Sequence, residues 1–303
     1  MKQFRAICSR NLKIYLRDRG SIFFSFLSMI IIIGLMLLFL GDTTVDTIMD
    51  VIKQIPGRGG EEDRMMAQNL IYLWTTAGIM AINSATITLA VYSNMIKDRT
   101  GNRLNSIMVM PISRGVIVLG YIVSAWMASV VMSLITLGVI EGIGVTKGIA
   151  IFPVRTQLML ILVIMLNSFV YSAVMYFAAS LIKTEGAWSG FGIVVGTLVG
   201  FLGGIYFPIG ALSETVQGAV KCFPIIYGTS MFRKIMMGAA EDDFYAGCPD
   251  EIRTIIDEKM GISLKVFKNT LSMSEETIIL IGIGIAFALL SVIYLKFSKK
   301  SDR

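Results

Sequence analysis

The sequence contains no histidine and only three cysteines. Histidine is the commonest metal ligand and a frequent general base, so its absence removes the usual basis for a metal site or for proton-transfer catalysis. The chain also lacks the G-x-x-x-x-G-K-[ST] loop with which P-loop proteins bind and hydrolyse ATP. We therefore expect no catalytic residues, no metal site and no cofactor on this chain.

Charged residues are missing from six long stretches of the sequence. Each stretch is long enough to cross a bilayer, which takes about 20 apolar residues. In lipid only helices and closed barrels satisfy the backbone, and continuous runs of this length indicate helices. The 303 residues are 55% hydrophobic, with a mean hydropathy of +0.73. The sequence predicts an all-α membrane protein with a single transmembrane domain, 1–303, and six spans at about 21–40, 70–95, 116–137, 157–182, 189–207 and 277–295.

Positive charge gathers on one side of this arrangement. Six spans place both termini on the same side, and the segments there hold 15 Lys and Arg against 4 Asp and Glu; these segments are 1–20, 97–114, 183–188 and 296–303. The other segments hold 12 basic and 17 acidic residues. Because short basic loops stay in the cytoplasm, we expect both termini to be cytoplasmic. The pI near 9.2 then reflects topology, and no nucleic-acid partner is expected.

Two segments flank the first span. Residues 1–19 place apolar side chains on one face and cations on the rest, which predicts an amphipathic helix in the cytoplasmic interface. A soluble tail is the alternative. Residues 41–64 carry six acids together with Pro-Gly and Gly-Gly pairs, which predicts an external, partly flexible loop.

A short basic segment, 97–114, reads KDRTGNRLNSIMVMPISR between two long apolar runs. Three apolar residues recur there at helical spacing, between a glycine and a proline that mark helix ends. The apolar residues are Leu104, Ile107 and Met108, and the end markers are Gly101 and Pro111. This pattern predicts an amphipathic helix that binds lipid or fits a partner's groove. The alternative is a solvated basic loop, which does neither.

After residue 207 the chain changes character. Pro208 and Pro224 divide it into two semi-apolar pieces, neither of which is expected to be long enough to span. Such pieces occur at membrane depth only when they are buried in protein or line a cavity. We expect a re-entrant segment over 208–238, followed by an external insertion over 239–276.

Two of the cysteines, Cys222 and Cys248, fall on the expected external side. A disulfide between them is one outcome, because such bonds persist outside the cytoplasm. Two unpaired thiols are the other outcome, since the pair shows no C-x-x-C spacing.

Polar residues recur on the second and fourth spans. They are Thr76, Asn83 and Thr86 on the second, and Asn167, Tyr171 and Tyr176 on the fourth. Polar groups inside a membrane need partners, so these residues either hydrogen-bond to a neighbouring helix or line a translocation path.

The fifth span carries a glycine every four residues, which makes a groove where another backbone can approach closely. These residues are Gly192, Gly196, Gly200 and Gly204. The groove serves either tight packing inside one subunit or contact with a second copy.

The sequence around the basic segment resembles a known family. Arg99-Thr100-Gly101, followed by Leu104 and by Met110 to Arg114 (MPISR), is similar to the first cytoplasmic loop of permease subunits of bacterial type-2 ATP-binding-cassette (ABC-2) exporters. The two Phe-Pro pairs at 207–208 and 223–224, with Leu212 and Tyr227, resemble the re-entrant external helices of the same family.

This resemblance implies a coupling helix in 97–114 that sits in a cleft of a separate ATPase subunit. The residues implied are Arg99, Gly101, Arg103, Leu104, Ile107, Met108, Pro111 and Arg114. The resemblance also implies ATP and Mg on that partner, a second permease copy or paralogue, and a place in the bacterial plasma membrane. We expect an amphipathic substrate, such as a drug or antimicrobial compound, a peptide or a lipid-linked glycan.

An ATP-independent channel or secondary carrier is the alternative function. Carriers tend to place ionisable residues at mid-membrane for ion coupling, and none of the six expected spans contains one. The same absence leaves an intramembrane enzyme without an evident base.

Overall fold

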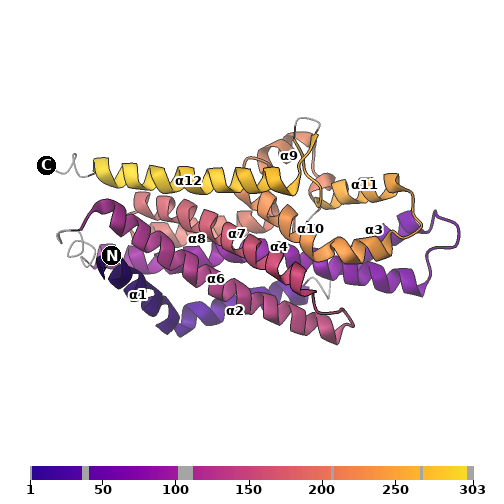
Figure 1. The fold of residues 1–303 in the computed structure, drawn as a ribbon, viewed down its shortest axis with the longest axis horizontal. Coiled ribbons are helices and arrows are strands. Elements are labelled where there is room, and N and C mark those ends of the chain that lie inside the picture. Colours follow the sequence, from indigo (N-terminus) through magenta and orange to yellow (C-terminus); the bar gives the residue numbers. More distant parts are fainter. Residues whose placement is uncertain (1, 36–40, 102–111, 206–207, 267–268, 299–303) are drawn as a thin grey trace.

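The computed structural model describes residues 2–35, 41–101, 112–205, 208–266 and 269–298. These residues are almost entirely helical and form an elongated bundle (Figure 1). Helix α1 (Lys2–Arg17) begins, and helix α12 (Met273–Ser298) ends, at one end of the bundle, which we call the terminal end. Helices α3 (Gly41–Ile52) and α11 (Asp250–Met260) lie at the opposite end, which we call the distal end.

Helix α4 (Glu61–Thr100) is the centre of the bundle. Its 40 residues give a length of about 60 Å, roughly twice the hydrocarbon thickness of a bilayer. Acidic residues fill its first turn and Lys97 and Arg99 lie in its last, as the helix dipole favours. It packs against α2 (Arg19–Leu35), α6 (Arg114–Thr146), α7 (Val154–Leu181), α8 (Glu185–Leu202) and α10 (Pro224–Phe244).

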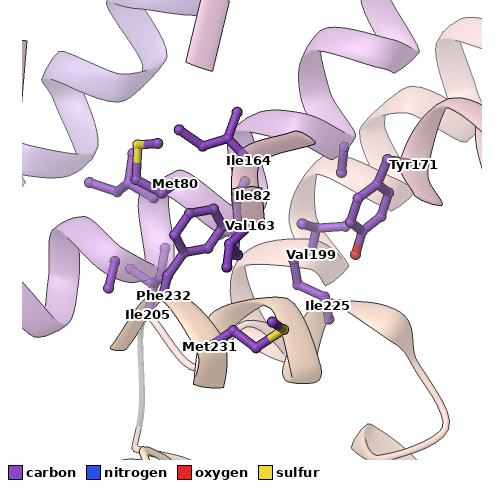
Figure 2. Packing of buried hydrophobic residues seen from close by; sticks show 14 of the residues in the cluster. Met80, Ile82, Val163, Ile164, Tyr171, Val199, Ile205, Ile225, Met231 and Phe232 are labelled. Atoms are coloured by element: carbon purple, nitrogen blue, oxygen red, sulfur yellow. The ribbon is translucent and has the colours of Figure 1, made fainter. Parts of the chain in front are cut away.

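The apolar core lies where α4, α7 and α10 meet. Met80 of α4, Val163 of α7 and Phe232 of α10 lie close together there (Figure 2). Gly228 lets α10 approach α7, because a Cβ at this position would lie 2.5 Å from Oδ1 of Asn167. Lipid tails are as apolar as these side chains, so close packing is what holds such helices together in a membrane.

Five described helices are long and apolar enough to cross a membrane: α4, α6, α7, α8 and α12. The expected first span, 21–40, overlaps α2, and residues 36–40 lie outside the described part of the chain. An all-α membrane protein is therefore confirmed, whereas the count of six spans stays a prediction.

Residues 41–64 contain a helix where we expected a partly flexible loop. Helix α3 covers their first half, and its buried Val45, Ile48 and Ile52 belong to the same apolar core as α4, against which it packs. These residues lie three and four positions apart and so share one helix face. This helical spacing was missed in the sequence because acids lie between the apolar residues and a Pro-Gly pair follows them.

The region after residue 207 also differs from expectation. A single helical turn η2 (Ile209–Ala211) and the short helix α9 (Glu214–Val220) form its first part. Its second part is not a short piece, because Pro224 opens the 21-residue helix α10 in place of breaking one. Proline suits a first turn, where its missing N–H needs no partner. The expected boundary between 238 and 239 consequently falls inside α10.

The distal end is completed by α11 and a small hairpin. Strand β1 (Lys265–Val266) pairs antiparallel with β2 (Asn269–Thr270), with Lys265 opposite Thr270. We call α11 and this hairpin the cap.

Candidate functional site

The basic segment joins the end of α4 to the start of α6 at the terminal end. Its central residues, 102–111, lie outside the described part of the chain, and with them Arg103, Leu104, Ile107, Met108 and Pro111. The two ends of the segment are described, and both are bonded to other helices.

Arg99, in the last turn of α4, caps the C-terminal end of α7. Its Nη1 donates to the carbonyl oxygens of Ala179 at 3.1 Å, Ser180 at 3.3 Å and Ile182 at 2.5 Å. The last carbonyls of a helix have no partner within the helix and carry the negative end of its dipole. A guanidinium at this place therefore satisfies α7 and fixes it to α4.

Arg114, the first residue of α6, does the same for α12. Its Nη1 donates to the carbonyl oxygens of Leu295 and Lys296, both at 3.0 Å. The two arginines that flank the basic segment thus hold the terminal ends of α7 and α12.

Helix α1 is tied to the same place by an ion pair. Nη2 of Arg10 lies 2.7 Å from Oδ2 of the buried Asp98. Nearby, Ile7 packs so closely on α6 that a Cβ at Gly120 would lie 2.8 Å from its Cγ2. Residues 2–17 are helical, as expected, and their buried face is turned toward α6; the place of this helix in the cytoplasmic interface stays a prediction.

Helix α8 makes the fourth connection. Oγ1 of Thr100 donates to Oε1 of Glu185, in the first turn of α8, at 2.8 Å. We call Asp98, Arg99, Thr100 and Arg114 the collar. Through it, the basic segment is bonded directly to α1, α7, α8 and α12.

Five of the six polar residues expected in the spans are buried inside this one subunit, and four of them, Asn83, Asn167, Tyr171 and Tyr176, pack between helices. Nδ2 of Asn83 donates to Oγ1 of Thr136 on α6 at 2.8 Å, and Nδ2 of Asn167 donates to the carbonyl oxygen of Ala81 on α4 at 3.0 Å. Tyr171 is buried, and the ring of Tyr176 makes an edge contact with Tyr92 at 5.8 Å between centroids. This geometry favours the packing interpretation for these residues.

Thr76 and Thr86, on α4, bond to their own helix. Oγ1 of the buried Thr76 donates to the carbonyl oxygen of Tyr72 at 2.8 Å. Thr86 is only half-buried and lines an open groove of about 570 Å³ between α2 and α4. The groove is lined by Asp18, Gly20, Ser21, Phe24, Ser25, Thr86, Ala90, Ser93 and Lys97. Of the six candidates, only Thr86 lines this groove.

The glycine series of the fifth span is interrupted. Helix α8 ends at Leu202, and Gly204 has φ 65°, a left-handed conformation that favours glycine just beyond a helix. Gly204 therefore ends the helix and cannot continue the expected groove. Gly192 packs against Leu89 of α4, while a Cβ on Gly196 would meet nothing within 4 Å.

The disulfide between Cys222 and Cys248, one of the two outcomes left open by the sequence, is not formed, and all three cysteines are free. Helix α10 runs between the two residues, and its 21 residues give about 30 Å. A disulfide needs Cα atoms within about 7 Å. The structure contains two unpaired thiols, which was the other outcome.

Arg233 on α10 is a polar residue that the sequence reasoning did not single out. It is fully buried at the distal end, with its guanidinium 4.2 Å from the ring centroid of Trp74. It donates to the carbonyl oxygens of Gly203 and Gly204 after α8, and of Met260 and Gly261 at the end of α11. An arginine in a semi-apolar stretch, Arg233 directly before Lys234, was the available signal, since a buried charge needs partners.

The fold and these contacts define a multi-pass helical membrane protein. The family model described as "ABC-2 family transporter protein" matches residues 61–293 of the chain. No curated protein matches it. The chain belongs to the ABC-2 transporter family, and the resemblance seen in its sequence is confirmed. It is a membrane component of an ABC transporter, a class that works with an ATP-binding-cassette partner.

Proposed function

We propose that this chain is the permease subunit of an ATP-driven exporter, and that its partner ATPase docks on the basic segment 97–114. The terminal end, with both termini, faces the cytoplasm, and the distal end faces outward. ATP and Mg bind to the partner, which supplies the energy of hydrolysis. The collar is the observation that carries this proposal, because it bonds both ends of the segment to four helices.

Movement of the segment on ATP-driven closure of the partner would pull on these helices together. Arg99 links the segment to α7, Arg114 links it to α12, and Asp98 links it to α1. Packed helices respond to such a displacement as rigid bodies, switching between discrete arrangements. The collar residues are in this account the means by which docking at one end opens a path across the membrane.

A second permease copy would complete the path along α8. This helix exposes Ile193, Val194, Leu198 and Phe201, and its exposed Gly196 leaves room for another backbone. Small residues on an apolar helix are the usual means of close helix contact in lipid.

The groove between α2 and α4 is the proposed substrate path. Its wall combines the exposed ring of Phe24 with the polar Ser21, Ser25 and Thr86, and Lys97 lies with Asp18 at the terminal end. An amphipathic substrate suits this lining, because its apolar part meets Phe24 and its polar part meets the hydroxyls.

Co-purification with the ATPase partner tests the proposal. The pair Leu104→Ala and Ile107→Ala should weaken the complex and lower its ATPase activity in lipid, because these side chains fill the partner's cleft. The matched control is Ile151→Ala with Val154→Ala, which truncates two exposed apolar residues between α6 and the start of α7. If the first pair leaves association and ATPase activity at the level of the control pair, the docking proposal is wrong.

A further inference from the structure

Acidic side chains meet in the interior of the distal end, where α10 ends and the cap begins. Glu241, in the last turns of α10, is buried, and its Oε1 has no hydrogen-bond partner in the described part of the chain. Two more buried polar atoms have no partner among the described residues: Oδ1 of Asp257 on α11, and the hydroxyl of Tyr245 directly after α10. Burying such groups without partners is costly, so their clustering needs an explanation.

Among the residues that the structure describes, one cation, Arg253, is paired with these acids. Nη2 of Arg253 lies 2.9 Å from Oδ1 of Asp242 and 3.6 Å from Oε2 of Glu241, and its Nε lies 3.9 Å from Oδ2 of Asp257. Arg253 therefore makes its shortest contact with Asp242, which is exposed, and longer ones with the two acids inside. A single positive charge cannot neutralise all three carboxylates.

The other charged groups that the structure describes around the cluster already have partners of their own. Arg58, from the turn before α4, pairs with Asp63 at 2.7 Å and donates to the carbonyl oxygens of Phe244 and Ala246. Glu258, beside Asp257 on α11, pairs with Lys265 of the hairpin. Cys248 contributes a thiol near Tyr245. Among the described residues, no group of three or more acidic, histidine or cysteine side chains is arranged to hold a metal ion.

We propose that Glu241 is a proton-binding site that links the pH outside the membrane to the docking of α11 on the rest of the distal end. With a proton on Glu241, the interior holds one carboxylate, Asp257, facing one arginine. When the proton leaves, two carboxylates face each other across the junction of α10 and α11, and the cap is loosened. This role rests on the proposed outward orientation of the distal end and adds regulation to the proposed function.

The pKa values support this assignment. Burial, and then the neighbouring charge of Asp257, raise the pKa of Glu241 to about 8. Burial also raises the pKa of Asp257 to about 6, although Arg253 opposes the shift. In an undocked cap both groups would return toward ordinary values near 4. Because the docked state then holds more protons than the undocked state, docking weakens as the pH rises from about 4 toward 8.

The far side of the cap is fastened by hydrogen bonds to backbone carbonyl oxygens. Nε1 of Trp74 donates to the carbonyl oxygen of Met260 at 2.8 Å, and Oγ of Ser230 donates to that of Ile262, also at 2.8 Å. The Arg233 guanidinium donates to Met260 as well. Loosening at the Glu241 side would therefore free the N-terminal part of α11 first, with the end near Met260 acting as the hinge.

Hydrogen exchange of the full chain in lipid nanodiscs, between pH 5.5 and 8, tests this site. After correction for the intrinsic exchange rate, protection of residues 250–260 should fall by about tenfold per pH unit, the value for release of one proton. In Glu241→Gln the dependence on pH should disappear above about pH 6, where Asp257 is already ionised. In Asp257→Asn it should move to lower pH, because the charge that raises the pKa of Glu241 is gone. Peptides from α7 serve as the internal reference.

Asp243→Asn is the matched control, since Asp243 lies on the same helix but is exposed. It should behave as the native chain does. A native chain whose α11 protection does not change with pH, or a Glu241→Gln chain that keeps the native slope, would overturn the proposal. Exchange in nanodiscs needs no ATPase partner, so this result is independent of whether the docking proposal holds.

Discussion

Replacement of Arg99 by glutamine should release the C-terminal end of α7 from α4. Nη1 of Arg99 has three carbonyl oxygens within 3.3 Å, but its two hydrogens can make only two good bonds at once. Hydrogen bonds from a charged group contribute about 1.5–3 kcal/mol each, and partial exposure reduces this to about 1 kcal/mol each. The loss should be about 2 kcal/mol, or roughly 30-fold in the equilibrium between the anchored and the released end.

Hydrogen exchange at residues 176–182 measures this release directly. Protection there should fall by about 10- to 30-fold in Arg99→Gln and by less in Arg99→Lys, because lysine keeps the charge but lacks the planar fork. Arg155→Gln, an exposed arginine at the other end of α7, is the matched control and should change nothing near residue 180. Native protection of the α7 end in Arg99→Gln would refute the assignment of Arg99 as its cap.

Three further substitutions test other parts of the structure. Gly228→Ala should destabilise the chain by about 1–3 kcal/mol in a denaturation assay, because its Cβ would lie 2.5 Å from Asn167. Gly238→Ala on the same helix is the control; its Cβ meets open space, so this substitution should not destabilise the chain. Arg233→Met should remove this donor from the carbonyl oxygens of Gly203, Gly204 and Gly261, and we expect faster exchange in the cap; an unchanged cap would contradict this role. Thr136→Val should lower the free energy of unfolding by about 1 kcal/mol, because the side-chain amide of Asn83 loses its acceptor. Adding Asn83→Leu should recover part of this loss, whereas additive losses would argue against coupling between the two residues.

The membrane architecture could be predicted from the sequence because it depends on local composition. Runs without charge identify spans wherever they occur, and five of the six expected runs correspond to membrane-length helices. Helix α3 was missed because its apolar residues at spacing three and four lie among acids. The end of α8 at Gly204 was missed because a regular glycine spacing does not reveal a left-handed turn.

The partners of the site residues could not be predicted for a different reason. Arg99 and Arg114 were named as residues of the coupling segment, but they bond to backbone carbonyls about 80 and 180 residues away. Backbone oxygens are present at every position, so no sequence pattern marks which of them a side chain will reach. Conversely, Asn83 and Asn167 were found by their polarity, but polarity alone did not distinguish a packed amide from one that lines a path.

Photo-crosslinking from position 108 in native membranes tests the central claim most directly. With a photoreactive amino acid in place of Met108, within the basic segment, we expect a crosslink to the ATPase partner that changes in yield when ATP is bound. The same amino acid in place of Val154, at the start of α7 and exposed, should give no such product. Absence of the ATPase from the position-108 product, with the complex otherwise intact, would contradict the claim that the partner docks on this segment.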